Sequence, residues 1–289
     1  MIDAHAHLWL KQQGTVNGLP VYDVGNGKSM FGDGVRQMMP PYMTDGVNSA
    51  ERFLANMDFA RVSAAVLTQE YIDGNQDAYL KTVRKTWPDR FRVTCLYEEN
   101  RLPDTEGADG IKICGGRLAE QDLTKHAEVF RLAAEKDMFI AIDMADGDTQ
   151  TGSLREMIRA FPELRIAIGH FGMVTRPGWQ EQIRLAREKN VSVESGGITW
   201  LFNSEFWPYP SAVRAILEAR DICGMEKLMW GSDYPRTMTV ITYGMSSSFA
   251  ERSEMLTDEE KNLFLLENAR AFYRFGPQPE MSVIHHMAE

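Results

Sequence analysis

Two histidines, His5 and His7, stand one residue apart in the opening run MIDAHAHLW. In a β-strand, residues two apart point to the same face and lie about 6–7 Å apart along the chain, so both imidazoles can converge on one cation. The opposite face of that strand then carries Ile2, Ala4, Ala6 and Leu8. The alternative is a half-buried strand whose two polar residues face water. The rest of the chain must decide between the two.

Further side chains capable of chemistry lie in, or directly after, short apolar runs later in the chain. They are Lys112 in GIKIC, Asp143 at the end of FIAID, His170 after RIAIG, Glu194 in VSVES and Asp233 after KLMWG. Polar groups are sparse within the runs and accumulate at their ends. A fold that needs only stability has no use for that bias, so these residues are candidates for a shared site.

The apolar runs predict eight strands, and most of them are followed by a helical pattern. The strands are expected at 1–8, 63–68, 91–96, 110–114, 139–143, 165–169, 191–195 and 227–231. The helices are expected at about 49–60, 75–87, 122–136, 152–160, 179–189, 210–221 and 257–273, whereas 97–108 is too broken for a helix. Alternation of this kind predicts an α/β protein with a parallel sheet, and eight units favour a (β/α)8 TIM barrel. Active-site residues of such barrels lie at the C-terminal ends of the strands.

The domain organisation follows from the same pattern. We expect one barrel domain over residues 1–276 and a tail over 277–289. A long Gly-rich loop, 11–46, follows strand one and shows only a weak hairpin signal near 19–24. A structureless loop of this length is usually an active-site cover or disordered. Its aromatic and basic residues favour the cover, namely Tyr22, Phe31, Arg36 and Tyr42.

The composition restricts the class of partner. The net charge of −10 argues against nucleic acid and against anionic membrane surfaces, which leaves a small-molecule substrate. The sequence has neither an 18-residue apolar run nor a secretory signal pattern at its start. Three widely spaced cysteines suit reduced thiols, so we expect a cytoplasmic location. Cys95 and Cys114 are expected in the core and not as nucleophiles.

Four motifs together resemble one family. They are IDAHAH at the start, IGHFG at 168–172, GSDYP at 231–235 and ENARAFY at 267–273. In this order the motifs are similar to the amidohydrolase-related family. The branch concerned contains the 2-pyrone-4,6-dicarboxylate and sugar lactonases and the aminocarboxymuconate-semialdehyde decarboxylase-like enzymes. The resemblance covers essentially the whole chain.

The resemblance implies a barrel with a cavity at the strand ends and, in many members, a divalent metal that is usually zinc. Its ligands are the paired histidines, a histidine after strand five and the aspartate after strand eight. His5, His7 and Asp233 match these positions, but Asp143 stands where the strand-five histidine is expected. Some lactonases of the branch work without metal. Asp143 is nevertheless an oxygen ligand, so manganese is an alternative to zinc.

The candidate residues suit hydrolysis of a small cyclic ester, as in a lactonase. Asp233 would take a proton from water, and His170 would hold the substrate carbonyl or the developing oxyanion. Lys112 and Arg36 are candidates for binding a substrate carboxylate or hydroxyl. The alternative function is a metal-dependent, non-oxidative decarboxylase of a small aromatic or muconate-type acid. A non-catalytic binding protein on a decayed barrel is a third hypothesis.

The remaining candidates carry weaker expectations. Glu194 is either a site residue or an interior acid paired with Lys112, and His126 is expected at the surface of an outer helix. His285 and His286 lie in the polar tail and are expected to play no part in catalysis. A cluster of aromatic residues after strand seven forms either a substrate wall or a packed loop at a subunit contact, which suggests a possible homodimer. These residues are Trp200, Phe202, Phe206, Trp207 and Tyr209.

Overall fold

The computed structural model of the chain describes residues 1–285 and 287. Eight parallel strands follow one another around a barrel in the order of the sequence. They are β1 (Ile2–Ala6), β6 (Ala64–Leu67), β7 (Phe91–Leu96), β8 (Gly110–Ile113), β9 (Phe139–Ile142), β10 (Arg165–Ile168), β11 (Val191–Glu194) and β12 (Leu228–Met229). The segment after β12 returns to β1, where the Ala4 amide donates to the Trp230 carbonyl at 2.9 Å and Ala6 bridges Tyr234 in parallel. The predicted TIM barrel is confirmed.

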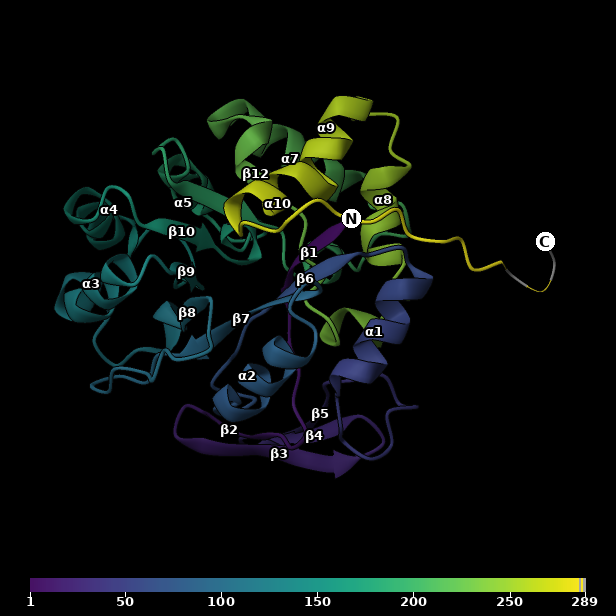
Figure 1. Cartoon of the computed structure of the whole chain (residues 1–289), viewed down its shortest axis with the longest axis horizontal. Helices are drawn as coiled ribbons and strands as arrows, with labels where there is room; N and C mark the ends of the chain where they lie inside the picture. Colours follow the sequence, from purple (N-terminus) through teal and green to yellow (C-terminus); the bar gives the residue numbers. More distant parts are fainter. Residues whose placement is uncertain (286, 288–289) are drawn as a thin grey trace.

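Helices follow most of the strands, and most of these helices cover the outside of the barrel (Figure 1). They are α1 (Ala50–Phe59), α2 (Asp77–Thr86), α3 (Ala127–Glu135), α4 (Thr151–Ala160), α5 (Trp179–Leu185), α6 (Ile198–Leu201), α7 (Pro210–Cys223), α8 (Met245–Glu251), α9 (Asp258–Asn262) and α10 (Asn268–Phe272). The start of α1 shows why they form: Ser49 caps the helix by accepting from the Arg52 amide, and Phe53 and Met57 bury one face. The single helix expected at 257–273 is interrupted by a π-helical turn at Leu263–Glu267.

The segment 11–46 differs from the structureless loop expected of it. It contains a four-stranded antiparallel sheet of β2 (Gln13–Val16), β3 (Leu19–Gly25), β4 (Lys28–Phe31) and β5 (Gly34–Gln37). Exposed side chains alternate with less exposed ones along these strands, and Gly-containing turns join them. In Figure 1 the sheet lies at the foot of the molecule, beside α2. Its first strand joins the barrel through the Thr15 amide, which donates to the Tyr71 carbonyl at 2.8 Å.

Strand β1 contains an irregularity that the simple alternation did not predict. Its pairing with β6 shifts between Asp3 and Ala6. Ile2 and Ala4 therefore pack in one core cluster, whereas Ala6 and Leu8 pack in another, and the four residues do not share one face. A β-bulge of this kind re-aims side chains in it and after it; here His5 lies within the bulge and His7 follows it.

The end of the barrel opposite the strand C-termini is filled with apolar side chains. Phe139 of β9 packs edge-on against Tyr273, with 4.9 Å between the ring centroids. Elsewhere in the core, Cys95 and Cys114 are buried as expected. His126 is buried too, contrary to the prediction that it lies at the surface. The Tyr97 hydroxyl and the Glu120 carbonyl each lie 2.9 Å from one of its ring nitrogens, and these partners offset the cost of burying a polar ring.

The C-terminal tail leaves the barrel near α8 (Figure 1). Within the described part of the chain, residues 276–285 form no helix or strand. His285 is exposed there, and His286 lies outside the described residues. None of the helices formed by the described residues is both long and apolar enough to cross a membrane.

Candidate active site

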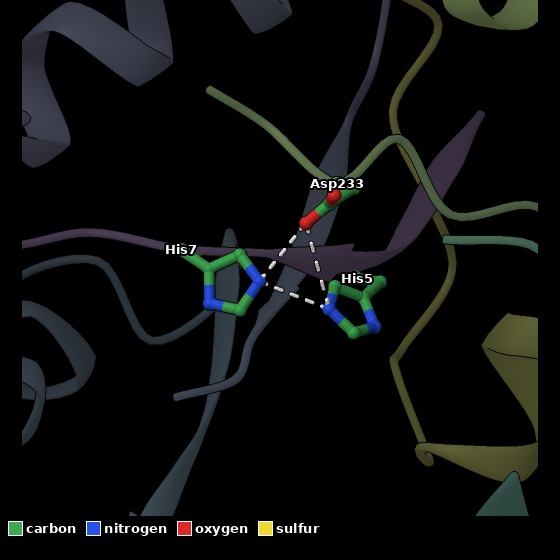
Figure 2. Close-up of side chains that lie close together, drawn as sticks. All are labelled: His5, His7 and Asp233. Carbon is green, nitrogen blue, oxygen red and sulfur yellow. Dashed lines mark hydrogen bonds and ion pairs between the residues drawn. The ribbon is translucent and has the colours of Figure 1, made fainter. Parts of the chain in front are cut away.

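His5, His7 and Asp233 converge at the C-terminal end of the barrel (Figure 2). The Nε2 atoms of the two histidines are 3.0 Å apart, and His7 Nε2 is 3.1 Å from Asp233 Oδ1. The distance from His5 Nε2 to the same oxygen is 3.9 Å. All three side chains are buried. The predicted pairing of the opening histidines with the aspartate after strand eight is therefore present.

Backbone geometry fixes the two segments that meet here. The Asp233 amide donates to the His5 carbonyl at 2.9 Å, and the His7 amide donates to the Tyr234 carbonyl at 2.8 Å. Asp233 and His170 adopt φ angles of 59° and 52°, in the left-handed region that residues with a side chain rarely occupy. Such strained residues concentrate at functional sites, where the surrounding structure holds them in place.

A second aspartate in the opening motif, Asp3, locks β1 to the loop after β12. Its carboxylate accepts from the Ser232 amide at 2.8 Å, from the Ser232 hydroxyl at 2.5 Å and from the Tyr243 hydroxyl at 2.9 Å. Burial raises the pKa of Asp3 to about 6, against the opposing effect of these hydrogen bonds. Asp3 also accepts from the His5 amide at 3.1 Å, and it is not among the described residues that line the cavity, so it positions the site without joining it.

The proton positions on the two imidazoles decide whether this cluster suits a cation. Glu194 Oε1 lies 2.6 Å from His5 Nδ1, so His5 donates from Nδ1 to this carboxylate and turns its Nε2 towards His7. His7 Nδ1 is buried and makes no hydrogen bond with any described residue; Asp73 Oδ2 lies 3.7 Å away. Burial, followed by the charge of Arg236, lowers the pKa of His7 to about 4, so His7 is neutral at pH 7.

These observations fit a divalent metal. The Nε2 atoms of His5 and His7 and one carboxylate oxygen of Asp233 face a common point. Their separations of 3.0, 3.1 and 3.9 Å bracket the value of about 3.3 Å expected between two ligands of a tetrahedral zinc. A cation would satisfy all three acceptors and leave the His7 proton on Nδ1, towards Asp73.

A second group shares His5 and contains Asp143 and His170. Asp143 Oδ2 lies 2.6 Å from Lys112 Nζ and 3.4 Å from His170 Nε2. Burial opposes the charge of His170, but Asp143 and the other nearby carboxylates raise its pKa to about 10. Burial likewise opposes ionisation of Asp143, whereas the charges of Lys112 and His170 hold its pKa well below the usual range. Asp143 and His170 thus form an ion pair at the cavity wall.

A cavity of about 430 Å³ opens above both groups. Its wall includes His7, Asp143, His170 and Asp233, all of them expected from the sequence. Met38 from the segment after β5 also lines it, so the segment 11–46 contributes to the wall as a cover would. Gly169 leaves room at the rim, because a Cβ atom there would lie 2.1 Å from Asp143 Oδ1. Four further charged residues line the cavity, namely Glu70, Arg117, Asp146 and Arg236.

The two basic residues nominated for substrate contact lie elsewhere. The Lys112 side chain is only 1% exposed and forms its ion pair with Asp143 beneath the cavity. Arg36 lies in β5 with its guanidinium 4.7 Å from the centre of the Phe31 ring. Neither is among the described residues that line the cavity. The basic residues that do line the cavity are Arg117 and Arg236.

Glu194 and the aromatic loop also have definite partners. Glu194 contacts His5 and not Lys112, because it accepts from the Gly196 amide at 2.5 Å and thereby turns towards β1. Trp200 lines the cavity, and its Nε1 donates to Asp233 Oδ2 at 2.8 Å. Of the other four aromatic residues, Tyr209 packs against Phe249, and none of the four is among the described residues of the cavity wall.

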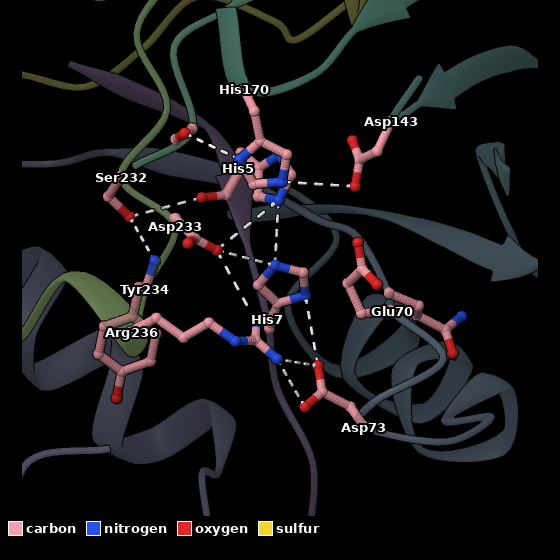
Figure 3. A network of polar contacts seen from close by, with 12 residues as sticks. His5, His7, Glu70, Asp73, Asp143, His170, Ser232, Asp233, Tyr234 and Arg236 are labelled. Atoms are coloured by element: carbon pink, nitrogen blue, oxygen red, sulfur yellow. Dashed lines mark hydrogen bonds and ion pairs between the residues drawn. The ribbon is translucent and has the colours of Figure 1, made fainter. Parts of the chain in front are cut away.

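Sequence reasoning missed Glu70 and Asp73, in the segment after β6, and Arg236, which begins a short 3-10 helix after β12. Glu70 and Asp73 follow strand 63–68 in the run TQEYIDG, so the rule that located Asp143 and His170 would have found them too. Burial and the neighbouring Asp143 charge raise the pKa of Glu70. Arg236 follows the GSDYP motif directly, and only the structure shows that it turns back to Asp73 (Figure 3).

Comparison with known proteins places the chain in a family. The family model described as amidohydrolase matches residues 2–275, so the chain belongs to the amidohydrolase family. No curated protein matches it significantly.

Solved structures share its fold. The probable 2-pyrone-4,6-dicarboxylic acid hydrolase of Acinetobacter baumannii is 18% identical, with a TM-score of 0.68 over 95% of this chain and 99% of the other. A zinc-bound amidohydrolase of Burkholderia multivorans is 16% identical, with the same score and coverage. The 5-carboxyvanillate decarboxylase of Novosphingobium aromaticivorans, complexed with manganese, is 17% identical, with a TM-score of 0.57 over 79% of this chain and 81% of the other. At these identities the likeness establishes the fold, and the chain is an enzyme of the amidohydrolase type.

Proposed function

We propose that this amidohydrolase opens a small cyclic ester, as a lactonase does. One observation supports the proposal most strongly: His7, Asp233 and the cationic His170 line one cavity, and His5 lies against His7 and Asp233. This arrangement supports the proposal that Asp233 is a base, that His5 and His7 are metal ligands and that His170 binds an oxyanion. A cavity of about 430 Å³ suits a substrate of this size.

Asp233 is the proposed base. Burial opposes its ionisation, but the hydrogen bond with His7 and the charge of Arg236 hold the pKa of Asp233 well below its usual range. It is therefore a carboxylate at neutral pH and can accept a proton. Trp200 holds one of its oxygens, which fixes the direction in which the other faces the histidine pair.

His170 is the proposed partner of the substrate carbonyl. Its Nδ1 donates to the Gly196 carbonyl at 2.9 Å, which fixes the ring, and the raised pKa keeps it protonated at neutral pH. A protonated imidazole at the cavity wall favours negative charge on a carbonyl oxygen as that charge develops. Asp143 keeps the ring charged and close to the floor of the cavity.

The proposed reaction then balances within the site. Asp233 takes a proton from water while the water oxygen attacks the carbonyl carbon of the ester. The ring C–O bond breaks, the departing oxygen receives that proton from Asp233, and the product is a hydroxy acid. A metal held by His5, His7 and Asp233 would lower the pKa of a bound water and polarise the carbonyl. We propose zinc, with manganese as the alternative and Asp143 as a further oxygen ligand.

A decarboxylase is the second candidate. Arg117 and Arg236 line the same cavity, where they could hold the carboxylate of a small aromatic or muconate-type acid. The manganese-bound decarboxylase among the structural neighbours has this type of activity on the same fold. The two candidates differ in product, because only decarboxylation releases carbon dioxide.

The test is a screen of sugar-acid lactones and pyrone carboxylates with purified protein, once after chelation and once with zinc or manganese added. Ring opening releases a proton from the new carboxylic acid, which a pH indicator records, while carbon dioxide release is measured in parallel with aromatic and muconate-type acids. Ring opening supports the lactonase. Carbon dioxide release without ring opening would transfer the proposal to the decarboxylase, and neither product would overturn both.

Two features of the setting are part of the proposal. We place the enzyme in the cytoplasm, consistent with three free cysteines at 95, 114 and 223. A homodimer is proposed through the aromatic loop, where the Phe206 side chain is 94% exposed. Light scattering of the purified protein, with Phe206→Ser as the variant, tests this assembly.

A further inference from the structure

An ion pair outside the histidine cluster connects two loops beside it. Arg236 Nη2 lies 2.8 Å from both carboxylate oxygens of Asp73, and both side chains are largely buried. Asp73 Oδ2 is 3.7 Å from His7 Nδ1, and Arg236 Nη1 is 3.8 Å from Asp233 Oδ1. Figure 3 shows the pair beside His7 and Asp233, with Asp73 next to His7 and Arg236 next to Asp233. The Asp73–Arg236 ion pair therefore faces both His7 and Asp233.

A chain of hydrogen bonds supports the same carboxylate from the antiparallel sheet. Ser29 of β4 donates to Gln12 Oε1 at 2.5 Å, and Gln12 Nε2 donates to Asp73 Oδ1 at 3.1 Å. The Gln13 amide also donates to the Asp73 carbonyl at 3.2 Å. Gln12, Ser29 and Asp73 are buried. The four-stranded sheet is thus joined to the loop after β6 at the residue that faces His7.

Stability alone is a poor explanation for this arrangement. Removing two charges from water costs several kcal/mol per ion, and a buried pair often only balances that cost. Apolar side chains of similar volume would hold two loops together at least as well. A carboxylate beside the outer nitrogen of a histidine has a specific effect, because it orients the ring and makes the inner nitrogen a stronger ligand.

We infer that Asp73, held by Arg236 and Gln12, is a positioning residue that sets the affinity of the His5–His7–Asp233 cluster for a divalent cation. Asp73 favours the form of His7 with its proton on Nδ1, which turns the Nε2 lone pair towards His5 and Asp233. Arg236 holds the Asp73 carboxylate in place and carries a positive charge beside Asp233. This inference rests on the metal-dependent form of the proposed function.

The experiment measures metal affinity without substrate. Chelator-stripped protein is titrated with zinc against a chromophoric chelator, and the Co²⁺-loaded protein is followed by its visible absorption, which reports the number and type of ligands. Asp73→Asn keeps the shape of the side chain and removes its charge. We expect its zinc affinity to fall about 10- to 100-fold, as for other outer partners of ligating histidines. We also expect the Co²⁺ spectrum to change.

The matched control is Asp45→Asn. Asp45 is also an aspartate paired with an arginine, Arg52, at 2.6 Å, but it lies at the surface and outside the described wall of the cavity. We expect its zinc affinity and Co²⁺ spectrum to match those of the wild type. Equal affinities for Asp73→Asn and Asp45→Asn would overturn the inference, as would a wild-type protein that binds no divalent metal.

Two Arg236 variants keep the test decisive if Asp73→Asn does not fold, as judged by circular dichroism. Arg236→Gln leaves Asp73 in place but unpaired, and it should weaken zinc binding. Arg236→Lys can still place one charged nitrogen near both Asp73 oxygens, so it should recover part of the affinity. No recovery relative to Arg236→Gln would count against a charge-dependent role. If metal binds as expected but no lactone is opened, the proposed function fails and this inference stands.

Discussion

Strand β9 begins and ends with opposite kinds of side chain. At its N-terminal end, Phe139 packs against Tyr273 in an apolar cluster, and Gly110 beside it has no room for a side chain. Just beyond its C-terminal end, Asp143 forms an ion pair with Lys112 beside a cavity. The same division holds for β1, in which Ile2 packs in the apolar cluster. These two strands thus separate packing from chemistry along their length.

The apolar and the charged end of the barrel differ in what they contribute to stability, and this difference points to the charged end as the functional one. Apolar packing at the N-terminal end stabilises the fold directly. The charged end gains little stability, because burying each charge costs about as much as its partner returns. Substitutions at the two ends should therefore have different effects. Those at the charged end should change activity and metal affinity, and those at the apolar end should change the free energy of unfolding.

The largest effect is expected at the charged end, from Asp233→Asn. An amide cannot accept the proton of the attacking water, so kcat/KM for the lactone found in the screen should fall about 10²- to 10⁴-fold. The variant should keep the circular dichroism spectrum of the wild type. A loss of less than tenfold would show that Asp233 is not the base.

The counterpart at the apolar end is Phe139→Ala. Its side chain is buried and fills the space between β9 and Tyr273, so its loss should lower the free energy of unfolding by about 3–5 kcal/mol. Urea denaturation measures this change. Below the midpoint of unfolding, kcat/KM should stay within a few-fold of the wild type. A large loss of activity in the folded variant would contradict the separation of the two ends.

His170 gives the charged end a pH-dependent contribution to stability. Its pKa is about 10 in the folded protein, against 6.5 for an unperturbed histidine, so folding favours the protonated ring. That contribution is complete below about pH 6.5 and disappears as the pH rises through 10, and it amounts to a few kcal/mol at most. In chelator-stripped protein, the wild type should lose more stability between these two values than His170→Asn does. Parallel curves for both proteins would contradict the raised pKa.

A smaller effect is expected from Glu194→Gln. Glu194 accepts from His5 Nδ1 at 2.6 Å, and an amide oxygen holds that proton less strongly than a carboxylate. Zinc affinity should fall about 10- to 100-fold in the chelator competition. Glu205→Gln is the control, because Glu205 accepts from the Ser211 amide at the start of α7 and lies outside the described wall of the cavity. Equal zinc affinities for the two variants would show that Glu194 does not influence metal binding.

The sequence predicted the barrel because its strands are buried on both faces. Such strands appear as short apolar runs, and a residue after each run must lie at the same end of the barrel. That rule, with the family motifs, located His5, His7, Asp143, His170 and Asp233 correctly at one end. It did not locate the antiparallel sheet of 13–37. The strands of this sheet are largely exposed and contain many polar residues, so their sequence resembles that of a loop.

Contacts between loops were beyond the sequence pattern. Arg236 and Asp73 are 163 residues apart, and neither lies within a periodic segment. Lys112 was placed correctly at a strand end, but the pattern could not show that its ammonium group turns to Asp143 and away from the cavity. The bulge in β1 was also hidden, because two residues between Asp3 and Ala6 are opposed by one in β6. Side-chain direction and partner choice depend on tertiary packing, which periodicity does not encode.

The smallest expected effect concerns a charge pair outside both ends of the barrel. Arg52 holds the pKa of Asp45 well below its usual range, yet the two side chains are 41% and 50% exposed. Solvent screens such a pair, so Asp45→Asn should change the free energy of unfolding by about 1 kcal/mol or less. Urea denaturation at low and high salt measures it, and the small effect should shrink further as salt is added. A loss as large as that of Phe139→Ala would mean that surface charge also stabilises the barrel, and the contrast between its two ends would then not account for its stability.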